Sequence, residues 1–151
     1  RTLVKTTLSQ SDASESKDGM DIALCVMNHK TLNLQYAGAF NPLYLIRKKE
    51  LQEFKADRMP IGIYHGKETS FTNYEIKLQK GDCLYIFSDG YIDQIGGDSG
   101  KKFLSKTMKN TLLEIHHESM PKQKEILNGI LTRWMGKYQQ VDDILIIGIR
   151  A

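Results

Sequence analysis

The chain alternates between short apolar runs and polar turns over much of its length, and this pattern predicts strands. In residues 31–39 (TLNLQYAGA), Leu32, Leu34 and Tyr36 occupy every second position, with polar residues between them. Such alternation is typical of a strand with one face toward a core and the other toward solvent. Further strands are predicted at the runs DIALCVMN (21–28), PLYLIR (42–47), LQEFKA (51–56) and TSFTNYEIKL (69–78).

Two later runs are apolar at successive positions instead of alternate ones. Residues 83–89 read CLYIFSD, and residues 144–150 read ILIIGIR. Because apolar side chains then project from both faces of the strand, both faces are expected to be covered. Both runs are therefore predicted to be buried strands.

Between these two strands the spacing of apolar residues changes to that of helices. Residues 103–117 place Phe103, Leu104, Met108, Leu112 and Ile115 roughly on one side, and residues 122–138 carry apolar residues at intervals of three and four. Ser119, followed closely by a proline, is typical of a helix start. The glycine-rich residues 96–102 are expected to form a loop.

The order of these elements predicts the fold class. Antiparallel hairpins come first, then two helices, then a strand that returns to the sheets. This order indicates an α+β fold, in which helices flank a layered, mostly antiparallel β core. We assign residues 18–151 to this domain and expect residues 1–17 to be the end of a helix and a polar linker.

Composition and charge narrow the function classes. The 21 basic and 18 acidic residues give a net charge of +3, and the lysines are scattered, so nucleic-acid binding is not expected. No run approaches the roughly 18 apolar residues of a membrane-spanning helix. The two cysteines, Cys25 and Cys83, lack a CxxC spacing and are interpreted as free thiols in a reducing compartment. We therefore expect a cytoplasmic location.

The candidate chemistry lies at the tips of the two strongly apolar strands. Asp89 ends the first, and Asp142 and Asp143 immediately precede the second. If the strands are antiparallel neighbours, these carboxylates meet at one edge. Two carboxylates about 4 Å apart repel by roughly 4 kcal/mol at an effective dielectric near 20, so such a cluster favours a bound cation. Hard oxygen ligands suit Mg²⁺ or Mn²⁺, and Gly90 lets backbone or solvent approach Asp89 closely.

A simpler interpretation of the same residues remains open at this point. Asp-Gly is a common turn dipeptide, and a pair of aspartates before a strand can be a solvated loop end. The sequence contains no G-x-S-x-G nucleophile elbow and no G-x-x-x-x-G-K-[ST] phosphate-binding loop. The four histidines are interpreted as structural or surface residues.

An ordered set of segments resembles a known family. These segments are SKDGMDIALCVMN, LQYAGAFNPLYLIR, MPIGIY, LQKGDCLYIFSDGYIDQIGG and VDDILIIGIR. Together they resemble the C-terminal portion of the catalytic domain of SpoIIE-type bacterial serine phosphatases, which belong to the metal-dependent protein phosphatase superfamily with protein phosphatase 2C. The resemblance runs from about residue 17 to residue 150 and implies two β-sheets between helices.

The resemblance also implies a mechanism and site residues. In such domains, two Mg²⁺ or Mn²⁺ ions activate a water molecule that attacks phosphorus, and no side chain acts as nucleophile. Asp89 matches the aspartate of the family's [ST]DG metal-binding motif, Gly90 supports its backbone, and Asp142 matches the other late ligand. Asp143 is the alternative ligand or a partner through metal-bound water.

Two upstream family motifs, of the GD-[FY] and D-x-[ST]-G-H-G types, do not occur in this sequence, which begins with Arg1. We therefore expect a portion of a longer protein that lacks the N-terminal part of the domain and is weakly active or inactive alone. The resemblance implies a phosphoserine or phosphothreonine protein as substrate, such as an anti-anti-sigma-like regulator in bacterial signalling. It also implies an upstream sensory region, in a parent protein that a membrane segment outside this chain could anchor.

Two other functions compete with this interpretation. The first is a non-catalytic regulatory or interaction module with the phosphatase fold, in which the acids are only surface turns. The second is a metal-dependent phosphodiesterase or nuclease, which would also use clustered carboxylates. The scattered positive charge and the lack of interleaved aromatic residues argue against the second.

Overall fold

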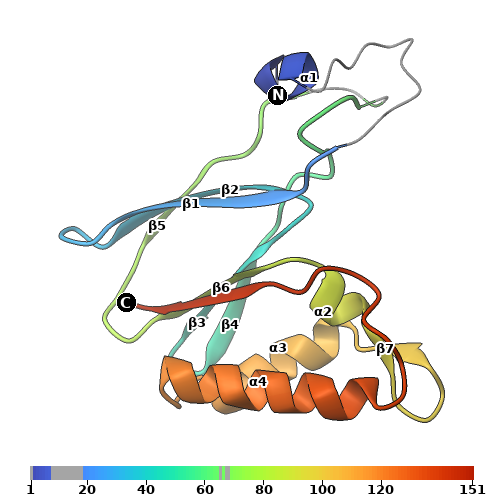
Figure 1. The fold of residues 1–151 in the computed structure, drawn as a ribbon. Helices are drawn as coiled ribbons and strands as arrows, with labels where there is room; N and C mark the ends of the chain where they lie inside the picture. Colours follow the sequence, from blue (N-terminus) through green and yellow to red (C-terminus); the bar gives the residue numbers. More distant parts are fainter. Residues whose placement is uncertain (1, 8–18, 65, 67–68) are drawn as a thin grey trace. The chain divides into compact units, whose positions relative to one another are not determined.

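The computed structural model describes residues 2–7, 19–64, 66 and 69–151. The chain forms two compact units, Arg1–Leu43 with Phe54–Leu78 and Tyr44–Glu53 with Gln79–Ala151. The helix end expected at the N-terminus is α1 (Thr2–Thr7) (Figure 1). Residues 8–18, which include most of the predicted linker, lie outside the described residues.

The first unit contains a three-stranded antiparallel sheet with the order β1-β2-β5. Its strands are β1 (Ile22–Asn28), β2 (Asn33–Ala39) and β5 (Tyr74–Lys77). The predicted alternation is present in β2, where Leu34 and Tyr36 are buried and the polar residues between them are exposed. The Tyr36 hydroxyl donates a hydrogen bond of 2.7 Å to the carbonyl oxygen of Asn41, which satisfies its polar end within the core.

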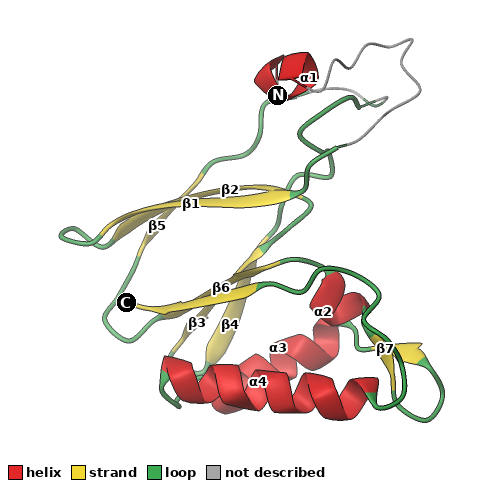
Figure 2. Ribbon diagram, viewed as in Figure 1, coloured by secondary structure: helices red, strands yellow, loops and turns green. Residues whose placement is uncertain are grey.

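The second unit contains a four-stranded sheet with the order β4-β3-β6-β9 (Figure 2). Its strands are β3 (Leu43–Arg47), β4 (Glu50–Phe54), β6 (Cys83–Phe87) and β9 (Ile146–Arg150). The strand predicted from residues 83–89 is β6. It is buried as expected, because Tyr85 and Phe87 belong to the core cluster and Leu84, on the opposite face, is only 4% exposed.

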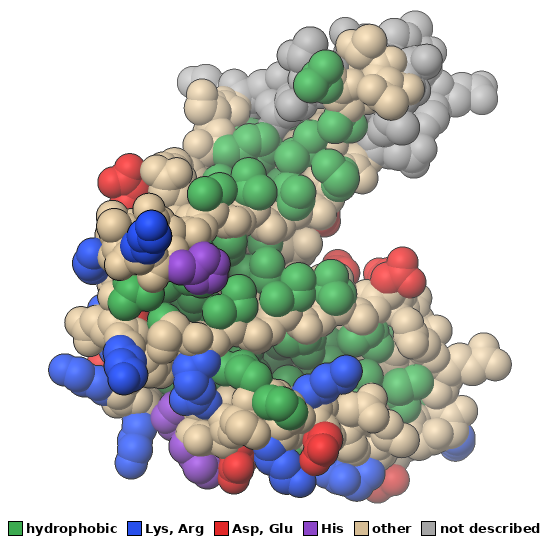
Figure 3. All heavy atoms as spheres, turned by 60° about the vertical axis from the view of Figure 1, so that its left-hand side comes forward, with side chains coloured by type: hydrophobic (Ala, Val, Ile, Leu, Met, Phe, Trp, Pro, Cys, Tyr) green, Lys and Arg blue, Asp and Glu red, His purple; other side chains and the backbone are tan. Residues whose placement is uncertain are grey.

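The expectation that residues 144–150 form a buried strand is wrong for most of β9. Ile147 and Ile149 are 42% and 38% exposed, and only Ile146 packs against the core cluster. Successive side chains of a strand point to opposite faces, so Ile147 and Ile149 project from the face opposite to Ile146, away from the core cluster. Within the described residues β9 is also an edge strand, because it pairs only with β6. Figure 3 shows hydrophobic side chains gathered on the surface of the molecule.

The segment between β6 and the long helices contains elements that the sequence pattern did not predict. A four-residue helix and a small hairpin occupy it: α2 (Gly90–Asp93), β7 (Ile95–Gly96) and β8 (Lys101–Lys102). The predicted glycine-rich loop is the tip of this hairpin, where Gly97 and Gly100 adopt positive φ values of 65° and 60°. Glycine adopts such values at lower cost than other residues.

Helices α3 (Ser105–Ile115) and α4 (Met120–Met135) cover one face of the four-stranded sheet (Figure 1). The apolar stripes predicted for them form the core with the sheet, with one exception. Leu104 precedes α3 with φ of 73° and is 57% exposed, so it does not share the buried stripe. Together these layers confirm the predicted α+β fold.

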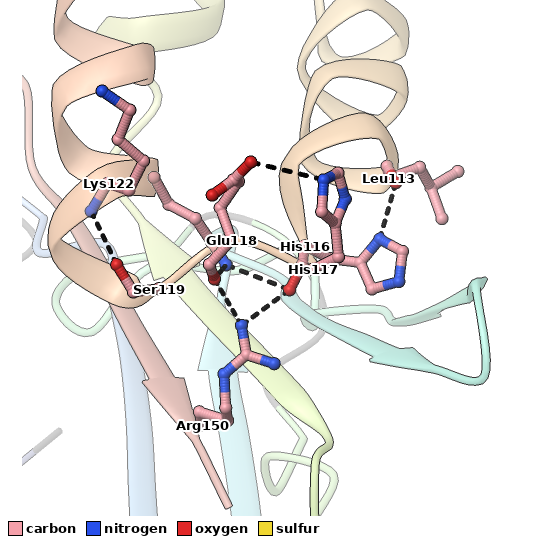
Figure 4. Close-up of polar contacts among 8 residues, drawn as sticks. Leu113, His116, His117, Glu118, Ser119, Lys122 and Arg150 are labelled. Atoms are coloured by element: carbon pink, nitrogen blue, oxygen red, sulfur yellow. Dashed lines mark hydrogen bonds and ion pairs between the residues drawn. The ribbon is translucent and has the colours of Figure 1, made fainter.

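The turn between α3 and α4 also fixes the end of β9. The Arg150 guanidinium donates hydrogen bonds to the carbonyl oxygens of His116 (2.7 Å) and Glu118 (2.6 Å) (Figure 4). Ser119 caps α4 by accepting a hydrogen bond from the backbone N–H of Lys122, as predicted for a helix start. In the described part of the chain, no helix has the length and apolar character needed to cross a membrane.

An ion pair between the half-buried Arg47 and the buried Asp82 joins β3 to the turn before β6. The Arg47 guanidinium donates to both carboxylate oxygens of Asp82, with Nη2 2.6 Å from Oδ2 and Nε 3.0 Å from Oδ1. Asp82 is only 2% exposed and also accepts a hydrogen bond from the backbone N–H of Gln79. These hydrogen bonds therefore replace the ones that the Asp82 carboxylate makes to water in the unfolded chain.

Candidate metal centre

The pairing of β6 with β9 brings the two acidic segments together. The strands are antiparallel, and Phe87 opposite Ile146 is the last pair of their ladder. One step further, the Ser88 N–H donates to the carbonyl oxygen of Leu145 at 3.0 Å, so the pairing continues beyond the strands. Asp89 therefore emerges beside the segment that carries Asp142 and Asp143. This is the antiparallel arrangement that the sequence predicted as a condition for a carboxylate site.

Ser88 ties the two segments together through its hydroxyl group. The Oγ atom donates to the carbonyl oxygen of Asp143 at 2.7 Å and accepts from the N–H of Leu145 at 2.9 Å. Both contacts are to the main chain, so they fix the backbone and leave the acidic side chains free. The only signal of this role in the sequence is a hydroxyl residue at the end of an apolar run.

Gly90 sits where the two backbones approach most closely. A Cβ atom added there would lie 2.3 Å from the carbonyl oxygen of Asp143 and 2.9 Å from its carbonyl carbon. Contacts of this length are not tolerated, so any other residue would push the Asp143 backbone away. The absence of a side chain at Gly90 thus permits the close approach of Asp143 to the residue that follows Asp89.

The three aspartates differ in their contacts, although all three are exposed. Asp89 precedes α2, but its carboxylate does not cap the helix. Asp142 Oδ1 accepts a hydrogen bond of 2.7 Å from the N–H of Asp143, and the Asp142 carbonyl oxygen accepts one of 2.7 Å from Gln140 Nε2. The carboxylate of Asp89 and the second oxygen of Asp142 are thus not engaged in these local contacts.

These donors suit a hard divalent cation, but they do not make a complete site. Carboxylate and carbonyl oxygens are the ligands that Mg²⁺ and Mn²⁺ prefer. Among the described residues, no three His, Cys, Asp or Glu side chains lie close enough together to hold a metal ion. The residues therefore fit part of the ligand shell of such a cation.

Tyr91 attaches α2, the helix that follows Asp89, to α4. Its hydroxyl donates to the carbonyl oxygen of Leu127 in α4 at 2.9 Å, and the side chain is only 1% exposed. A tyrosine hydroxyl is protonated at neutral pH and can donate this bond, and burial raises the pKa of Tyr91 further, to about 12. The rigid contact with α4 holds the start of α2, and with it Asp89.

Ser88→Ala is expected to lower the free energy of unfolding by about 1 kcal/mol, because two main-chain groups lose a partner. The amide of Leu145 should also exchange with deuterium faster, as measured by hydrogen–deuterium exchange. Ser88→Thr keeps the hydroxyl and serves as the control, with little change in either quantity. Equal exchange at Leu145 in the alanine variant and the parent would contradict this role of Ser88.

The structure resembles solved phosphatase domains. The SiaA-PP2C domain of Pseudomonas aeruginosa is 31% identical, covers 95% of this chain and 55% of its own, and superposes with a TM-score of 0.83. The phosphatase domain of the cell fate determinant SpoIIE from Bacillus subtilis is 15% identical, with 99% and 63% covered and a TM-score of 0.66.

A third solved structure is the catalytic domain of the serine threonine protein phosphatase PstP in complex with two manganese ions. It is 15% identical, with 86% of this chain and 57% of that chain covered, at a TM-score of 0.57. This chain thus spans little more than half the length of the solved relatives that it matches. At identities below 25%, the second and third likenesses show the shared fold alone.

Two sequence comparisons address the family of this chain. A comparison with curated proteins gives no match. The family model of stage II sporulation protein E (SpoIIE) matches residues 3–151, which is nearly the whole chain. The chain therefore belongs to the SpoIIE family of phosphatase domains, within the metal-dependent, protein phosphatase 2C-like superfamily.

Proposed function

We propose that this chain is part of a Mg²⁺- or Mn²⁺-dependent phosphatase domain that hydrolyses phosphoserine or phosphothreonine in a protein substrate. The observation that carries the proposal is that the segment with Asp89 lies beside the segment with Asp142 and Asp143 at one end of the β6–β9 pair. Membership of the SpoIIE family supports it. Because the chain spans only part of its relatives, we infer that further metal ligands lie in the part of the domain that it does not span.

Each residue of the site has a distinct role in this proposal. Asp89 and Asp142 bind the cation directly, and Asp143 is the alternative ligand to Asp142. Ser88 and Gly90 hold the two backbone segments together, so that the carboxylates need no reorganisation when the cation arrives. When bound, Mg²⁺ or Mn²⁺ lowers the pKa of water and stabilises negative charge on the phosphoryl oxygens.

We further propose that the substrate is a phosphorylated regulator of the anti-anti-sigma type, and that an upstream sensory region of the parent protein controls the domain. The exposed position of Asp89, Asp142 and Asp143 supports a macromolecular substrate, because a phosphorylated loop can approach the acids from solvent. A small metabolite would be expected to bind in a more enclosed cavity.

The test is a calorimetric titration of Mn²⁺ into the 151-residue chain. Saturable binding is expected, and Asp89→Asn and Asp142→Asn should each weaken it by about tenfold or more, since each removes a charged ligand. Asp98→Asn makes the same change of charge at an exposed position in the β7–β8 hairpin and should leave the affinity unchanged. Phosphatase activity toward a phosphoserine peptide is measured in parallel.

Two outcomes would contradict the metal assignment. The first is the absence of saturable binding by the folded parent chain. The second is an equal Mn²⁺ affinity in Asp89→Asn and Asp98→Asn. That result would mean that the loss of a negative charge, and not the loss of a ligand, weakens binding. The first result would mean that this chain alone does not form the site, either because the ligands outside it are indispensable or because the chemistry is lost. The second would favour a regulatory module that keeps the phosphatase fold without a metal site.

A further inference from the structure

Gln94 is a fully buried polar side chain next to the candidate site. It follows α2 and is 0% exposed. Its Nε2 atom donates hydrogen bonds of 2.9 Å to the carbonyl oxygens of Ile95 and Gln139, and its Oε1 atom accepts one of 3.3 Å from the N–H of Val141. The side chain therefore connects the end of α2 to the segment between α4 and β9.

The chemistry of these contacts requires an amide. A carboxamide offers two N–H donors and one carbonyl acceptor, and at Gln94 all three meet main-chain groups. Glutamate has no second donor, and methionine, although similar in size, has neither donors nor a comparable acceptor. Each main-chain group left unpaired in a buried place costs free energy, so this segment depends on the amide.

The segment that Gln94 holds leads directly into the acidic pair. Gln139 and Val141 stand immediately before Asp142, and Ser88 holds the backbone just after it, at Asp143. The acids are therefore fixed on both sides. The two side chains that hold this backbone, Ser88 and Gln94, lie on either side of Asp89 in the sequence. The segment with Asp89 is therefore attached at two points to the segment with Asp142 and Asp143.

The main chain of Gln94 is itself held by hydrogen bonds from other elements. Its main-chain carbonyl oxygen accepts hydrogen bonds of 3.0 Å from the N–H of Phe103 and from Trp134 Nε1. The N–H of Gly97 donates to the carbonyl oxygen of Trp134 at 2.8 Å. The main chain around Gln94 is thus attached to the end of α4, independently of its side chain.

We propose that Gln94 is a positioning residue, which holds residues 139–141 so that Asp142 and Asp143 stay beside Asp89. The part of this inference that concerns cation affinity rests on the proposed function. The structural part does not, because it concerns the order of the backbone around the acids and can be measured without any metal. This role could not be predicted from the sequence, because glutamine is mostly an exposed residue.

A matched pair of variants tests the inference. Gln94→Met removes the three hydrogen bonds with little change in volume. Gln123→Met is the control, because Gln123 is also buried (2% exposed) and also makes three such contacts. It donates to the carbonyl oxygens of His116 and Glu118 and accepts from the Tyr85 hydroxyl. Two of these contacts lie at the α3–α4 turn and the third is with Tyr85 in β6, so Gln123 makes none of its three hydrogen bonds with residues 139–145.

Hydrogen–deuterium exchange is measured on the metal-free full chain. The amides of Val141, Asp143 and Leu145 should exchange about tenfold faster in Gln94→Met and at the parent rate in Gln123→Met. In the Mn²⁺ titration, Gln94→Met should bind about tenfold more weakly than Gln123→Met, the usual effect of losing a group that orients a ligand. Thermal unfolding of both variants shows whether their losses of stability are comparable.

The outcomes separate the two claims. Equal exchange of the three amides in both variants would overturn the inference. Faster exchange in Gln94→Met with equal Mn²⁺ affinity would overturn its role in positioning the acids. If the parent binds no Mn²⁺, the proposed function fails and exchange alone decides the inference. If Gln94→Met does not fold, Gln94→Asn replaces it, because it keeps the amide but shortens its reach by one bond of about 1.5 Å.

Discussion

Arg47→Met is expected to lower the free energy of unfolding by about 1.5–3 kcal/mol, because the buried Asp82 carboxylate loses its hydrogen bonds from the half-buried guanidinium. Asp82 is 2% exposed, and after the substitution its carboxylate keeps only the hydrogen bond from the N–H of Gln79. A buried charge with so little compensation destabilises the native state. Urea denaturation followed by the fluorescence of Trp134, the single tryptophan, measures the loss within the second unit.

The loss of stability should be partly recovered when the unpaired charge of Asp82 is also removed. Arg47→Met/Asp82→Asn removes the charge and keeps an oxygen that can accept from Gln79, so it should be more stable than Arg47→Met alone. Lys122→Met breaks an exposed pair with Glu125 and should leave stability unchanged. A loss in Arg47→Met no greater than in Lys122→Met would contradict the importance of the pair between Arg47 and Asp82.

The same pair makes stability depend on acid pH. Burial by itself would raise the pKa of Asp82, but the hydrogen bonds from Arg47 and Gln79 and the charge of Arg47 hold that pKa below its usual value. A carboxyl group with a lowered pKa in the folded state stabilises the protein above its unfolded pKa, near 4. This contribution is lost as the pH falls from about 4 through the folded pKa. Urea denaturation of the parent and Asp82→Asn across this range measures it, because the variant should lose less stability.

Gly90→Ala is expected to destabilise the chain by about 1–3 kcal/mol and to weaken Mn²⁺ binding by about tenfold or more. The added Cβ would lie 2.3 Å from the Asp143 carbonyl oxygen, so the Asp143 backbone must move and its hydrogen bond with Ser88 is disturbed. Alanine restricts the unfolded chain and thereby offsets up to about 1 kcal/mol, which is too little to reverse the sign. Urea denaturation and the Mn²⁺ titration measure the two effects.

Gly129→Ala is the matched control for this substitution. Gly129 lies within α4, where an added Cβ would meet only the end of the Arg133 side chain, at 3.4 Å. Alanine in a helix interior is more stable than glycine by about 0.5–1 kcal/mol, so this variant should gain stability and keep its Mn²⁺ affinity. If Gly90→Ala also gained stability, the close approach of Asp143 to Gly90 would be disproved.

The sequence alone determined the β1–β2 and β3–β4 hairpins, both long helices and the positions of the acids relative to their strands. Alternating side chains in β2 and the unbroken apolar run in β6 each report burial directly, because every residue signals which face of the strand it occupies. The antiparallel return of the last strand followed from element order. These properties depend on neighbours along the chain, and therefore they can be read from it.

Other features depended on contacts between residues far apart in the sequence. α2 has only four residues, too few for a helical period, and is fixed by the bond from Tyr91 to α4. β9 carries three isoleucines, yet Ile147 and Ile149 are exposed because they project from the face opposite to Ile146, which packs against the core. Gln94 and Gly90 acquire their roles from partners about 45 to 55 residues away. Only the tertiary structure brings those partners close, so only it could assign the residues that hold the acids in place.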